Sequence, residues 1–589
     1  MLENEYGAFG SDKAYLRALA DILKKNFDGF LYTNDQPSQV SLSGGSLPGV
    51  LAEVDGKNST EAFDSLRKYI TDNSMRGPLL NGEMYITWFD AWGSGQSHQT
   101  KSGDAKAIDT AVADLEWVLK NNHSFSIYMF HGGTNFGFEN GSKFVNGLKP
   151  VTSSYDYGAP LDESGRPTDV YYKLRNMISK YVAKDSIPEV PTTSNLTVVD
   201  EFTLYPAVSL YDTLPTEPSK RSAQPVTMES LGQSYGFVLF EHIVTEDVSG
   251  ALAPGDEPRD RIIVHVNGKK VGVTDRTYAT PTAVQLSLKK GDVLRLLVEN
   301  LGRVDYDRIL QDQAKGIVGA VKIGAKTLNN WSTYSIPLTS LPEKALNGTS
   351  SNSANIQDGP VFYSGIFRLK DGASNDLTGD MFLSLPSGVK GQVWVNGINL
   401  GRYWDVGPQQ SLYVPGVYLQ ANGTANQVVV LELEPQADVT MIGRGIATRE
   451  WGNNQIKAYA TIQAENYTTK NGTKVQSTLD VGGGDNVGWI HAGNWLAYRH
   501  VNFGSAGAKQ FTARIASGTT VSGEIQVVLD SRTATPICSV SISSTGGWQN
   551  WTNKTASVSA VTGVHSVYLV FKSHQPDDFV NVNWFSFSE

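Results

Sequence analysis

Two short stretches of this chain end an apolar run in a carboxylate, and these carboxylates are its clearest candidates for chemistry. Residues 3–7 read Glu-Asn-Glu-Tyr-Gly and place Glu5 just before a glycine that can turn the chain. Residues 77–93 place Glu83 at the end of another apolar run, within a segment rich in Tyr and Trp. Barrel enzymes hold their reactive groups at the C-terminal ends of strands, where a loop and a helix follow. An acidic surface loop is the alternative interpretation of residues 3–7.

The combination of two such carboxylates with nearby aromatic side chains predicts cleavage of a glycosidic bond. One carboxyl acts as acid and base, and the other acts as nucleophile or base. In a retaining enzyme the two groups lie about 5–5.5 Å apart. Their mutual repulsion raises the pKa of one group, so one of Glu5 and Glu83 is expected to stay protonated while the other is ionised.

Four motifs in order connect these stretches to a known family. They are Asn-Glu-Tyr-Gly, Gly-Pro-Leu followed by Glu83, Tyr-Met-Phe-x-Gly-Gly-Thr-Asn-Phe and Ser-Tyr-Asp-Tyr-x-Ala-Pro, at residues 4–7, 77–83, 128–136 and 154–160. With them the chain resembles glycoside hydrolase family 35, the β-galactosidases, over about residues 1–450. The resemblance implies that Glu5 is the acid/base and Glu83 the nucleophile of a retaining enzyme.

The resemblance also implies a set of substrate contacts around the two acids. Asn4 is expected to bond to the 2-hydroxyl of the sugar, Trp88 to cover its apolar face, and Tyr128 to hydrogen-bond the nucleophile. The complete set of expected substrate-binding residues is Asn4, Tyr85, Trp88, Tyr128 and Tyr157. Capping of a strand end is the alternative role for Asn4, and core packing is the alternative for the aromatic residues.

Alternating strand and helix patterns must position these residues. Helices are predicted at residues 11–27, 60–73, 104–120 and 168–182, and strands at residues 1–6, 28–33, 50–54, 79–85 and 124–130. This alternation predicts a parallel sheet covered by helices, as a partial (β/α)8 TIM barrel at residues 1–185.

The family places the acid/base at the end of barrel strand four and the nucleophile at the end of strand seven. We therefore expect this chain to begin near the end of strand four and to hold only the second half of the barrel. A half-barrel would leave a strand edge unpaired, so we expect the chain alone to have negligible activity. We expect this sequence to be a truncated one that starts at an internal methionine, and a natural half-barrel is the alternative interpretation.

The rest of the chain has the short strands and frequent turns of β-sandwiches. A Pro/Thr-rich linker at residues 186–196 precedes a predicted jelly-roll domain at 197–345 and a second, galactose-binding-like β-sandwich at 346–445, as the resembled family has. The dipeptides Asn267-Gly268 and Asn396-Gly397, each after Val-x-Val, predict hairpin turns. A second linker at residues 446–457 leads to a β-rich domain at 458–589.

This last domain carries its own ordered motifs, which include Asn-Val-Gly-Trp489, Gly-Gly-Trp548 and Asn581-Val-Asn-Trp-Phe. With them it resembles a family 6 carbohydrate-binding module, which is a calcium-containing β-sandwich. The resemblance implies that Trp489 and Trp548 hold one sugar ring between them and that Asn581 bonds to its hydroxyls. Packing inside the domain is the alternative role for both tryptophans.

The same resemblance implies a structural Ca2+ in the C-terminal module. Its expected ligands are Gln463, Glu465 and Asn583. The family commonly has Asp where this chain has Asn583, so one ligand charge is lost and weaker binding of the ion is expected.

Composition and charge argue against several other function classes. The 589 residues have a formal net charge of −10, which argues against nonspecific nucleic-acid binding. No apolar run has the length of a membrane span. His98, His123 and His131 lack the spacing of metal ligands and are predicted to be incidental, and no cofactor is expected for catalysis.

The sequons bear on the compartment. Cys538 is the only cysteine, so no intrachain disulfide can form. Secretory handling is favoured by Asn-x-Ser/Thr sequons at Asn58, Asn122, Asn140, Asn195, Asn330, Asn347, Asn422, Asn466, Asn471, Asn550 and Asn553. We predict a secreted, extracellular or vacuolar-lysosomal protein, whose signal peptide would precede the expected internal start.

Together these patterns predict a retaining exo-β-galactosidase that releases terminal non-reducing β-D-galactose from glycans or polysaccharides. Its expected partners are β-galactosides and the polysaccharide bound by the C-terminal module. Two alternatives stay open: a noncatalytic glycan-binding protein with a degenerate barrel, and an exo-glycosidase of another specificity on the same scaffold. The intact Glu5 and Glu83 argue against the first.

Overall fold

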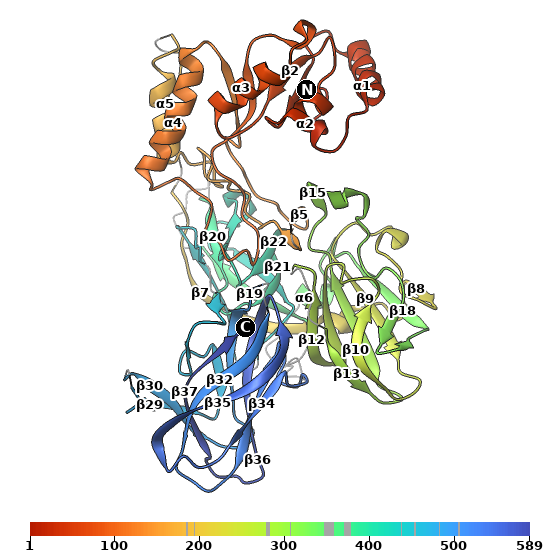
Figure 1. Cartoon of the computed structure of the whole chain (residues 1–589), viewed down its shortest axis with the longest axis vertical. Coiled ribbons are helices and arrows are strands. Elements are labelled where there is room, and N and C mark those ends of the chain that lie inside the picture. The colour runs from red at the N-terminus through yellow and green to blue at the C-terminus, as the bar shows by residue number, and fades with distance from the viewer. Residues whose placement is uncertain are drawn as a thin grey trace. The chain divides into compact units, whose positions relative to one another are not determined.

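The structure is a computed structural model, and it describes residues 1–589 except 146, 184–185, 194, 278–282, 307, 347–358, 370–378, 437–438, 453–454, 482 and 505–506. The chain divides into two units (Figure 1). The first unit comprises Met1–Asp90, His98–Asn135 and Ser154–Leu196, and the second comprises Ala91–Ser97, Phe136–Ser153 and Thr197–Glu589.

The first unit is built on a parallel sheet. Strands β1 (Tyr32–Asp35), β2 (Leu51–Val54), β3 (Leu80–Tyr85) and β4 (Ser124–Tyr128) lie in chain order, and every neighbouring pair is parallel. Asn4 adds a parallel bridge to Asn34, so the first residues run beside β1. The expected part of a (β/α)8 barrel is therefore confirmed, with the first of its five predicted strands reduced to this bridge.

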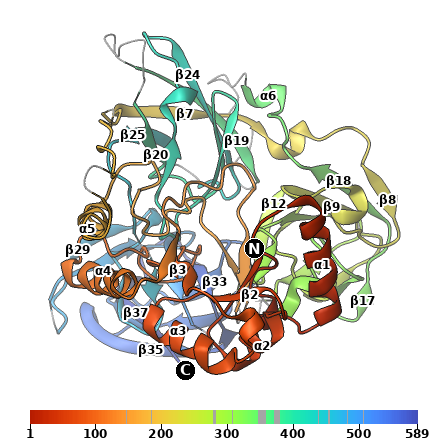
Figure 2. The same ribbon diagram turned by 90° about the horizontal axis from the view of Figure 1, so that it is seen from above.

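Five helices accompany these strands, and the second, third and fourth of them connect one strand to the next, as parallel pairing requires. They are α1 (Lys13–Asn26), α2 (Gln39–Gly45), α3 (Ser59–Tyr69), α4 (Ala105–Lys120) and α5 (Asp169–Ile178), and Figure 2 shows them in an arc around the strands. Asp12, Asn58 and Asp104 cap α1, α3 and α4 by accepting main-chain N–H bonds. Helix α2 was not predicted because its Gly/Ser-rich sequence lacks an apolar period.

The core of this unit lies between the sheet and its helices. Phe63 and Leu66 of α3 pack with Val54 of β2 in one cluster. Met84 of β3 packs with Leu115 of α4 in another cluster, which also includes residues of α5. The apolar faces of these helices thereby hold the C-terminal ends of β2 and β3 in a fixed register.

The second unit begins with a β-sandwich of two sheets. One sheet has the order β12-β11-β14-β9-β18-β8 and the other β13-β10-β16-β17. The strands are β8 (Lys220–Ser222), β9 (Phe237–Ile243), β10 (Val248–Pro254), β11 (Arg261–Val266), β12 (Lys269–Asp275), β13 (Gln285–Leu288), β14 (Val293–Glu299), β16 (Val321–Ile323), β17 (Lys326–Thr327) and β18 (Trp331–Ile336). Asn267 and Gly268 join β11 to β12 with positive φ at both residues, as the predicted hairpin turn requires.

The next sheet of this unit has eight strands, in the order β22-β21-β24-β19-β7-β25-β20-β23. The strands are β7 (Val199–Ser209), β19 (Val361–Arg368), β20 (Met381–Ser384), β21 (Lys390–Val395), β22 (Ile398–Trp404), β23 (Ser411–Val414), β24 (Ala425–Glu432) and β25 (Met441–Ile446), and α6 (Glu343–Leu346) precedes β19. The predicted turn at Asn396 and Gly397 joins β21 to β22, again with positive φ at both residues.

Two segments join different sheets from those that the domain boundaries implied. Strand β7 lies within the range 197–345 but pairs with β19 and β25 of the eight-stranded sheet. Strands β5 (Ser142–Phe144) and β6 (Leu148–Pro150), within the range 1–185, belong to the second unit, where β5 pairs with β15 (Val304–Tyr306). Sequence pattern identifies a strand, but it does not identify the strand's partner.

The C-terminal module is a sandwich of two further sheets (Figure 1, blue). One contains β26, β28, β31, β36, β33 and β34, and the other β27, β29, β30, β37, β32 and β35. Their bounds are β26 (Ile456–Lys457), β27 (Ile462–Gln463), β28 (Thr469–Asn471), β29 (Lys474–Ser477), β30 (Asp485–Ile490), β31 (Trp495–Asn502), β32 (Ala508–Ser517), β33 (Gly523–Leu529), β34 (Cys538–Ile542), β35 (Gly547–Val561), β36 (Val564–Ser573) and β37 (Val580–Ser588). Phe503, Phe511, Phe585 and Phe587 fill a core that this module forms from its own residues.

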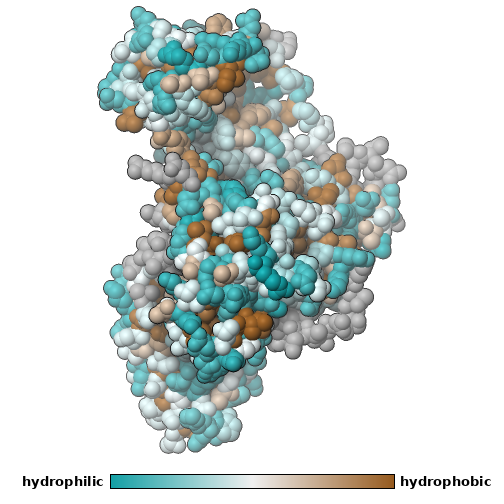
Figure 3. Space-filling model, turned by 90° about the vertical axis from the view of Figure 1, so that its right-hand side faces the viewer, coloured by the Kyte–Doolittle hydropathy of each residue, from teal (hydrophilic) through white to brown (hydrophobic). Residues whose placement is uncertain are grey.

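The surface is mixed in character. Figure 3 shows hydrophilic residues over most of the visible face and hydrophobic ones in small groups. None of the helices in the described part of the chain has the length and hydropathy that a membrane crossing requires.

Candidate active site

Glu5 lies where the first segment leaves the sheet. Its main-chain N–H donates to the oxygen of Asn34 at 2.8 Å, and its φ of 49° lies in the left-handed region. The next turn is held by the N–H of Gly7, which donates to Oδ1 of Asp35 at 2.9 Å. A Cβ at Gly7 would lie 1.7 Å from the main-chain oxygen of Ser41, so the close approach to α2 requires glycine here. Positive φ is a strained conformation for a non-glycine residue, and such residues are common at functional sites.

Glu83 lies on β3 and is held by two neighbours. The hydroxyl of Tyr85 donates to Oε2 of Glu83 at 2.7 Å, and the side chain of Asn4 lies near the same carboxyl. Burial raises the pKa of Glu83, and the charge of Glu5 raises it further, while Tyr85 and Asn4 oppose both effects. Both predicted acids and Asn4 are therefore close enough to interact at the C-terminal end of one sheet.

The four predicted aromatic residues form one cluster beside Glu83. Tyr85 packs on Trp88 and on Tyr128 with ring centroids 5.2 and 5.8 Å apart. Tyr157 packs on Trp88 at 5.8 Å and on Tyr128 at 5.5 Å. The tyrosine that donates to Glu83 is Tyr85, whereas Tyr128 was expected in this role; the Tyr128 hydroxyl lies 3.4 Å from that of Tyr155.

Tyr157 has the features of a ligand-binding side chain. It is 1% exposed, and its hydroxyl has no hydrogen-bond partner among the described residues. Its φ of 63° is again left-handed. A buried hydroxyl without a partner is costly unless a ligand satisfies it, so the predicted bond to a sugar gives this group a role.

His98 was expected to be incidental, but it links two loops of the site. Its Nδ1 lies 2.6 Å from Asp90 and its Nε2 lies 3.2 Å from Asp156. Burial by itself lowers the pKa of His98, but the bonds to Asp156 and Asp90 outweigh burial and leave it raised. His98 thus joins the loop of Trp88 to the loop of Tyr157. The sequence signal was two aspartates within two positions of these aromatic residues.

Three further carboxyls of the parallel sheet were not predicted from the sequence. Asp35, Glu53 and Asp55 are each 1–2% exposed, at or near the ends of β1 and β2. Burial is the main cause that raises the pKa of Asp35 to about 6, of Glu53 to about 8 and of Asp55 to about 9. None of them belongs to one of the four motifs, so nothing in the sequence singled them out.

The C-terminal module has its own cavity. Trp489, Trp548 and Asn581 line it together with Gln476 and Asp578, and its volume is about 300 Å³. The two indole side chains are 43% and 39% exposed, which is high for tryptophan in a folded domain. Asn581 donates to the main-chain oxygen of Trp548 at 2.8 Å and so also fixes the strand that carries this ring. The structure brings all three predicted residues together.

The expected calcium ligands lie on two paired segments of the module. Gln463 of β27 pairs with Trp584 of β37, and the N–H of Ala464 donates to the oxygen of Asn583 at 2.9 Å. Oε2 of Glu465 and Oδ1 of Asn583 are buried without a partner among the described residues.

The donors at this corner fit a calcium ion by their chemistry. Asn583 uses its Nδ2 to bond to Asp480 at 2.8 Å, which leaves its oxygen free. Oxygen donors of this kind suit Ca2+. The described residues contain no group of three or more His, Cys, Asp or Glu that could hold a metal.

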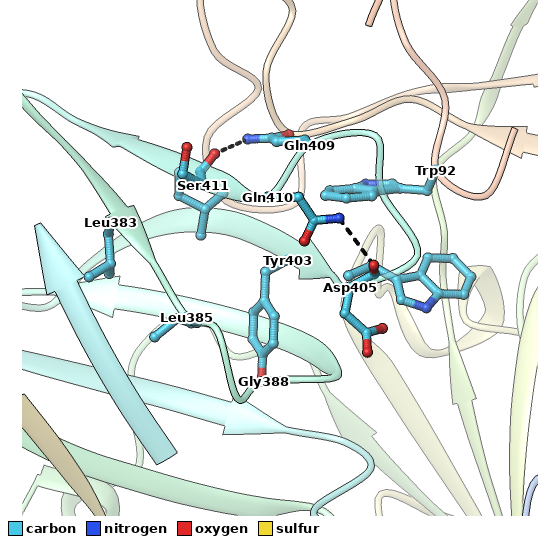
Figure 4. Close-up of a pocket in the computed structure, with 11 residues that line it drawn as sticks. Trp92, Leu383, Leu385, Gly388, Tyr403, Asp405, Gln409, Gln410 and Ser411 are labelled. Atoms are coloured by element: carbon cyan, nitrogen blue, oxygen red, sulfur yellow. Dashed lines mark hydrogen bonds between the residues drawn. The ribbon is translucent and has the colours of Figure 1, made fainter. Parts of the chain in front are cut away.

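A further cavity lies in the eight-stranded sheet beside Trp92 (Figure 4). Gln409 donates to the oxygen of Ser411 at 2.9 Å and Gln410 to that of Asp405 at 3.1 Å, as the dashed lines in Figure 4 mark. The cavity volume is about 20 Å³, which is room for roughly one water molecule. A sugar ring cannot enter it.

Family models match four parts of the chain. Glycosyl hydrolases family 35 matches residues 1–181, the first all-beta domain of beta-galactosidase residues 225–337, the galactose-binding domain of beta-galactosidase residues 360–426, and the family 6 carbohydrate binding module residues 463–589. These matches agree with the family resemblances drawn from the motifs.

Curated relatives give the same result over most of the chain. A beta-galactosidase of Bos taurus is 36% identical over 462 residues, covering 74% of this chain and 67% of the relative. A beta-galactosidase of Xanthomonas manihotis is 34% identical over 424 residues, covering 70% of this chain and 66% of the relative. The chain thus spans about two thirds of the length of these relatives.

Solved structures match the C-terminal module. A beta-1,3-glucan-binding CBM6 from Bacillus halodurans is 41% identical, covers 23% of this chain and 99% of its own, and has a TM-score of 0.22. A family 6 module from Clostridium cellulolyticum in complex with xylose is also 41% identical. The match covers 23% of this chain and 100% of that module, with a TM-score of 0.22.

Proposed function

The chain belongs to glycosyl hydrolases family 35, and we propose that Glu83 is the nucleophile and Glu5 the acid/base of a retaining, exo-acting β-galactosidase. The family makes it a glycoside hydrolase of the β-galactosidase type, and its C-terminal module is a carbohydrate-binding module. The observation that supports this proposal is the position of Glu83, whose carboxyl accepts a hydrogen bond from the neutral hydroxyl of Tyr85 and lies near Asn4 and Glu5.

The reaction proceeds in two displacements on this arrangement. The ionised carboxylate of Glu83 attacks the anomeric carbon while the glycosidic C–O bond breaks and the proton of Glu5 passes to the leaving oxygen. Water then attacks the glycosyl-enzyme ester, Glu5 takes a proton from that water, and Glu83 leaves as a carboxylate. Free galactose is released with its anomeric configuration retained.

The surrounding side chains bind and orient the sugar. Trp88 offers a ring face for the apolar side of galactose, and the unpartnered hydroxyl of Tyr157 offers a hydrogen bond. Asn4 offers its amide to the 2-hydroxyl, where a bond strengthens in the transition state.

The C-terminal cavity supports binding to polysaccharide. Trp489 and Trp548 line one cavity, and both rings are exposed there. Aromatic rings in such a position can stack on the apolar face of a pyranose. Attachment to insoluble glycan raises the local concentration of substrate without changing the chemistry. Secretory export, which the sequons favour, would bring the enzyme to such glycans.

The roles of the two acids are tested by removing each in turn in a form of the enzyme that hydrolyses an aryl β-galactoside. Glu83→Gly should abolish hydrolysis of an aryl β-galactoside, and added azide should restore it with an inverted glycosyl azide as product. Glu5→Gly should spare the glycosylation step for good leaving groups, because these need no proton. Glu53→Gln removes a buried carboxyl from the same sheet and should leave both behaviours unchanged. If Glu5→Gly slowed the glycosylation step equally for substrates with good and with poor leaving groups, the role of Glu5 as acid/base would be refuted.

A further inference from the structure

A third carboxyl at the end of β2 lies between the two acids already assigned. Asp55 directly follows Val54 and its side chain is 2% exposed. Its main-chain N–H donates to the oxygen of Asp35 at 3.2 Å, and the N–H of Gly56 donates to the oxygen of Glu83 at 3.1 Å. The main chain therefore holds Asp55 between the end of β1 and the nucleophile.

The carboxyl of Asp55 faces the carboxyl of Glu5 closely enough for the two groups to share a hydrogen bond. An ionised carboxylate only accepts hydrogen bonds, so two carboxyls bond to each other only when one of them carries a proton. Oδ2 of Asp55 is buried and receives no bond from an N–H or O–H of the described residues. A buried carboxylate without donors is strongly disfavoured, whereas a buried carboxylic acid that donates a bond is not.

The charges around Asp55 favour the same protonation state. The titratable groups that face it are the carboxyls of Glu5, Glu83 and Asp35 and the hydroxyl of Tyr85. Burial is the main cause that raises the pKa of Asp55 to about 9, and the hydrogen bond and charge of Glu5 follow, then the charges of Glu83 and Asp35. Asp55 is thus neutral at the pH where the other carboxyls carry the chemistry.

We propose that Asp55 is a positioning residue that stays protonated through the reaction and donates its hydrogen bond to Glu5. This inference rests on the role proposed above for Glu5. When Glu5 gives its proton to the leaving oxygen, it becomes a carboxylate, and the O–H of Asp55 then bonds to a charged acceptor instead of a neutral one. Such bonds strengthen when the acceptor becomes ionised, so the stabilisation grows along the reaction coordinate. Asp55 itself neither gains nor loses a proton.

The protonation state of Asp55 is tested by direct titration of the chain, without substrate. Aspartate carboxyl carbons are labelled with 13C and followed by NMR or infrared spectroscopy, which leaves Glu53 and the other glutamates unseen. One aspartate should stay protonated above pH 7, disappear in Asp55→Asn, and titrate at least about one pH unit lower in Glu5→Gln, which removes the facing charge. Titration of Asp55 together with the surface aspartates below pH 5 would overturn the inference.

The positioning role is tested by the dependence of rate on the leaving group in the catalytically active enzyme. Asp55→Leu removes the donor, and Asp55→Asn keeps an N–H donor. Asp55→Leu should slow the glycosylation step about 10- to 100-fold more for substrates with poor leaving groups than for substrates with good ones. Asp55→Asn should reverse most of this extra loss. Glu53→Gln, two residues earlier in the chain and similarly buried, should leave the dependence unchanged.

These outcomes separate this inference from the proposed function. A protonated Asp55 in a chain without galactosidase activity would count against the function alone. Equal losses on good and poor leaving groups for both Asp55 variants would mean that Asp55 acts only on stability, and the inference would be wrong.

Discussion

At the scale of single residues, the site is defined by groups that the protein holds in costly states. Glu5 and Tyr157 have left-handed backbone conformations, and the hydroxyl of Tyr157 is buried without a partner among the described residues. Asp55 is buried among carboxyls. Each of these states lowers stability locally and is retained where the surrounding structure over-determines it. Their concentration around Glu83 is a physical mark of function that does not depend on any motif.

The ion pairs of His98 predict a pH-dependent contribution to stability. The folded pKa of His98 is raised, so its contribution is complete below the unfolded value of about 6.5 and is lost as the pH rises through the folded value. His98→Gln should therefore lower the free energy of unfolding by about 1–3 kcal/mol at pH 5 and by less at pH 9.

Urea unfolding of the wild type and the variant at both pH values measures this difference. His131→Gln is the control, because Nε2 of His131 faces a main-chain oxygen of Glu163 rather than a pair of carboxylates. An equal loss for His98→Gln at pH 5 and pH 9 would mean that charge plays no part.

At the scale of elements, parallel strand ends bring distant residues to one edge. Glu5, Asp55 and Glu83 are far apart in the sequence, but each stands at or near the C-terminal end of a neighbouring parallel segment. The helices between them only need to return the chain to the next strand. In the C-terminal module the pairing of β27 with β37 has the same effect on Glu465 and Asn583.

Because β27 pairs with β37, we propose that a structural calcium ion is bound here, with Gln463, Glu465 and Asn583 as its side-chain ligands. Ca2+ that binds the folded state should stabilise it by mass action, so EDTA should lower the thermal midpoint of the module's unfolding transition and added Ca2+ should restore it. Glu465→Gln should lose most of this response, because one ligand charge is removed.

Differential scanning calorimetry of the full chain measures the effect. Glu524→Gln, on β33 of the other sheet, is the matched control and should keep the response to EDTA. No change in midpoint on chelation of the wild type would argue against the ion.

At the scale of the whole molecule, the chain combines a glycoside hydrolase region with a carbohydrate-binding module, and most of its described sequons lie at the surface. Nine of the sequons in the described residues place their asparagine in exposed positions, at Asn58, Asn122, Asn195, Asn330, Asn422, Asn466, Asn471, Asn550 and Asn553. Asn140 differs, because its side chain is 4% exposed, donates to the oxygen of Leu301 at 3.0 Å and accepts from Arg402 at 3.0 Å.

We expect glycans on exposed sequons and none on Asn140 when the protein is expressed through a secretory pathway. A glycan on Asn140 would break both hydrogen bonds and would have no room. Mass spectrometry of tryptic peptides, after release of glycans in labelled water, measures occupancy at each position. A glycan on Asn140 would contradict the described packing.

The C-terminal cavity should govern retention on polysaccharide independently of catalysis. Trp489→Ala and Trp548→Ala should each weaken binding on the order of tenfold or more, because each removes an aromatic anchor. Tyr459→Ala is a matched control, since Tyr459 is 39% exposed, like Trp548, and lies outside the cavity. Affinity electrophoresis on glucans and xylans measures the change, and unchanged mobility of both tryptophan variants on a retained polysaccharide would refute the role.

The sequence by itself determined the features that depend on neighbours along the chain. Apolar periods located the strands and most helices, and Asn-Gly dipeptides located both hairpins, because turn geometry is a property of two residues. The ordered motifs identified Glu5, Glu83 and the aromatic cluster.

Only the tertiary structure decided which distant groups meet. Strand β7 joins the eight-stranded sheet, Tyr85 rather than Tyr128 bonds to Glu83, and His98 links two loops. The same holds for the contact of Asp55 with Glu5. Register between paired strands and burial set these contacts, and neither quantity is encoded in the local pattern of any one segment.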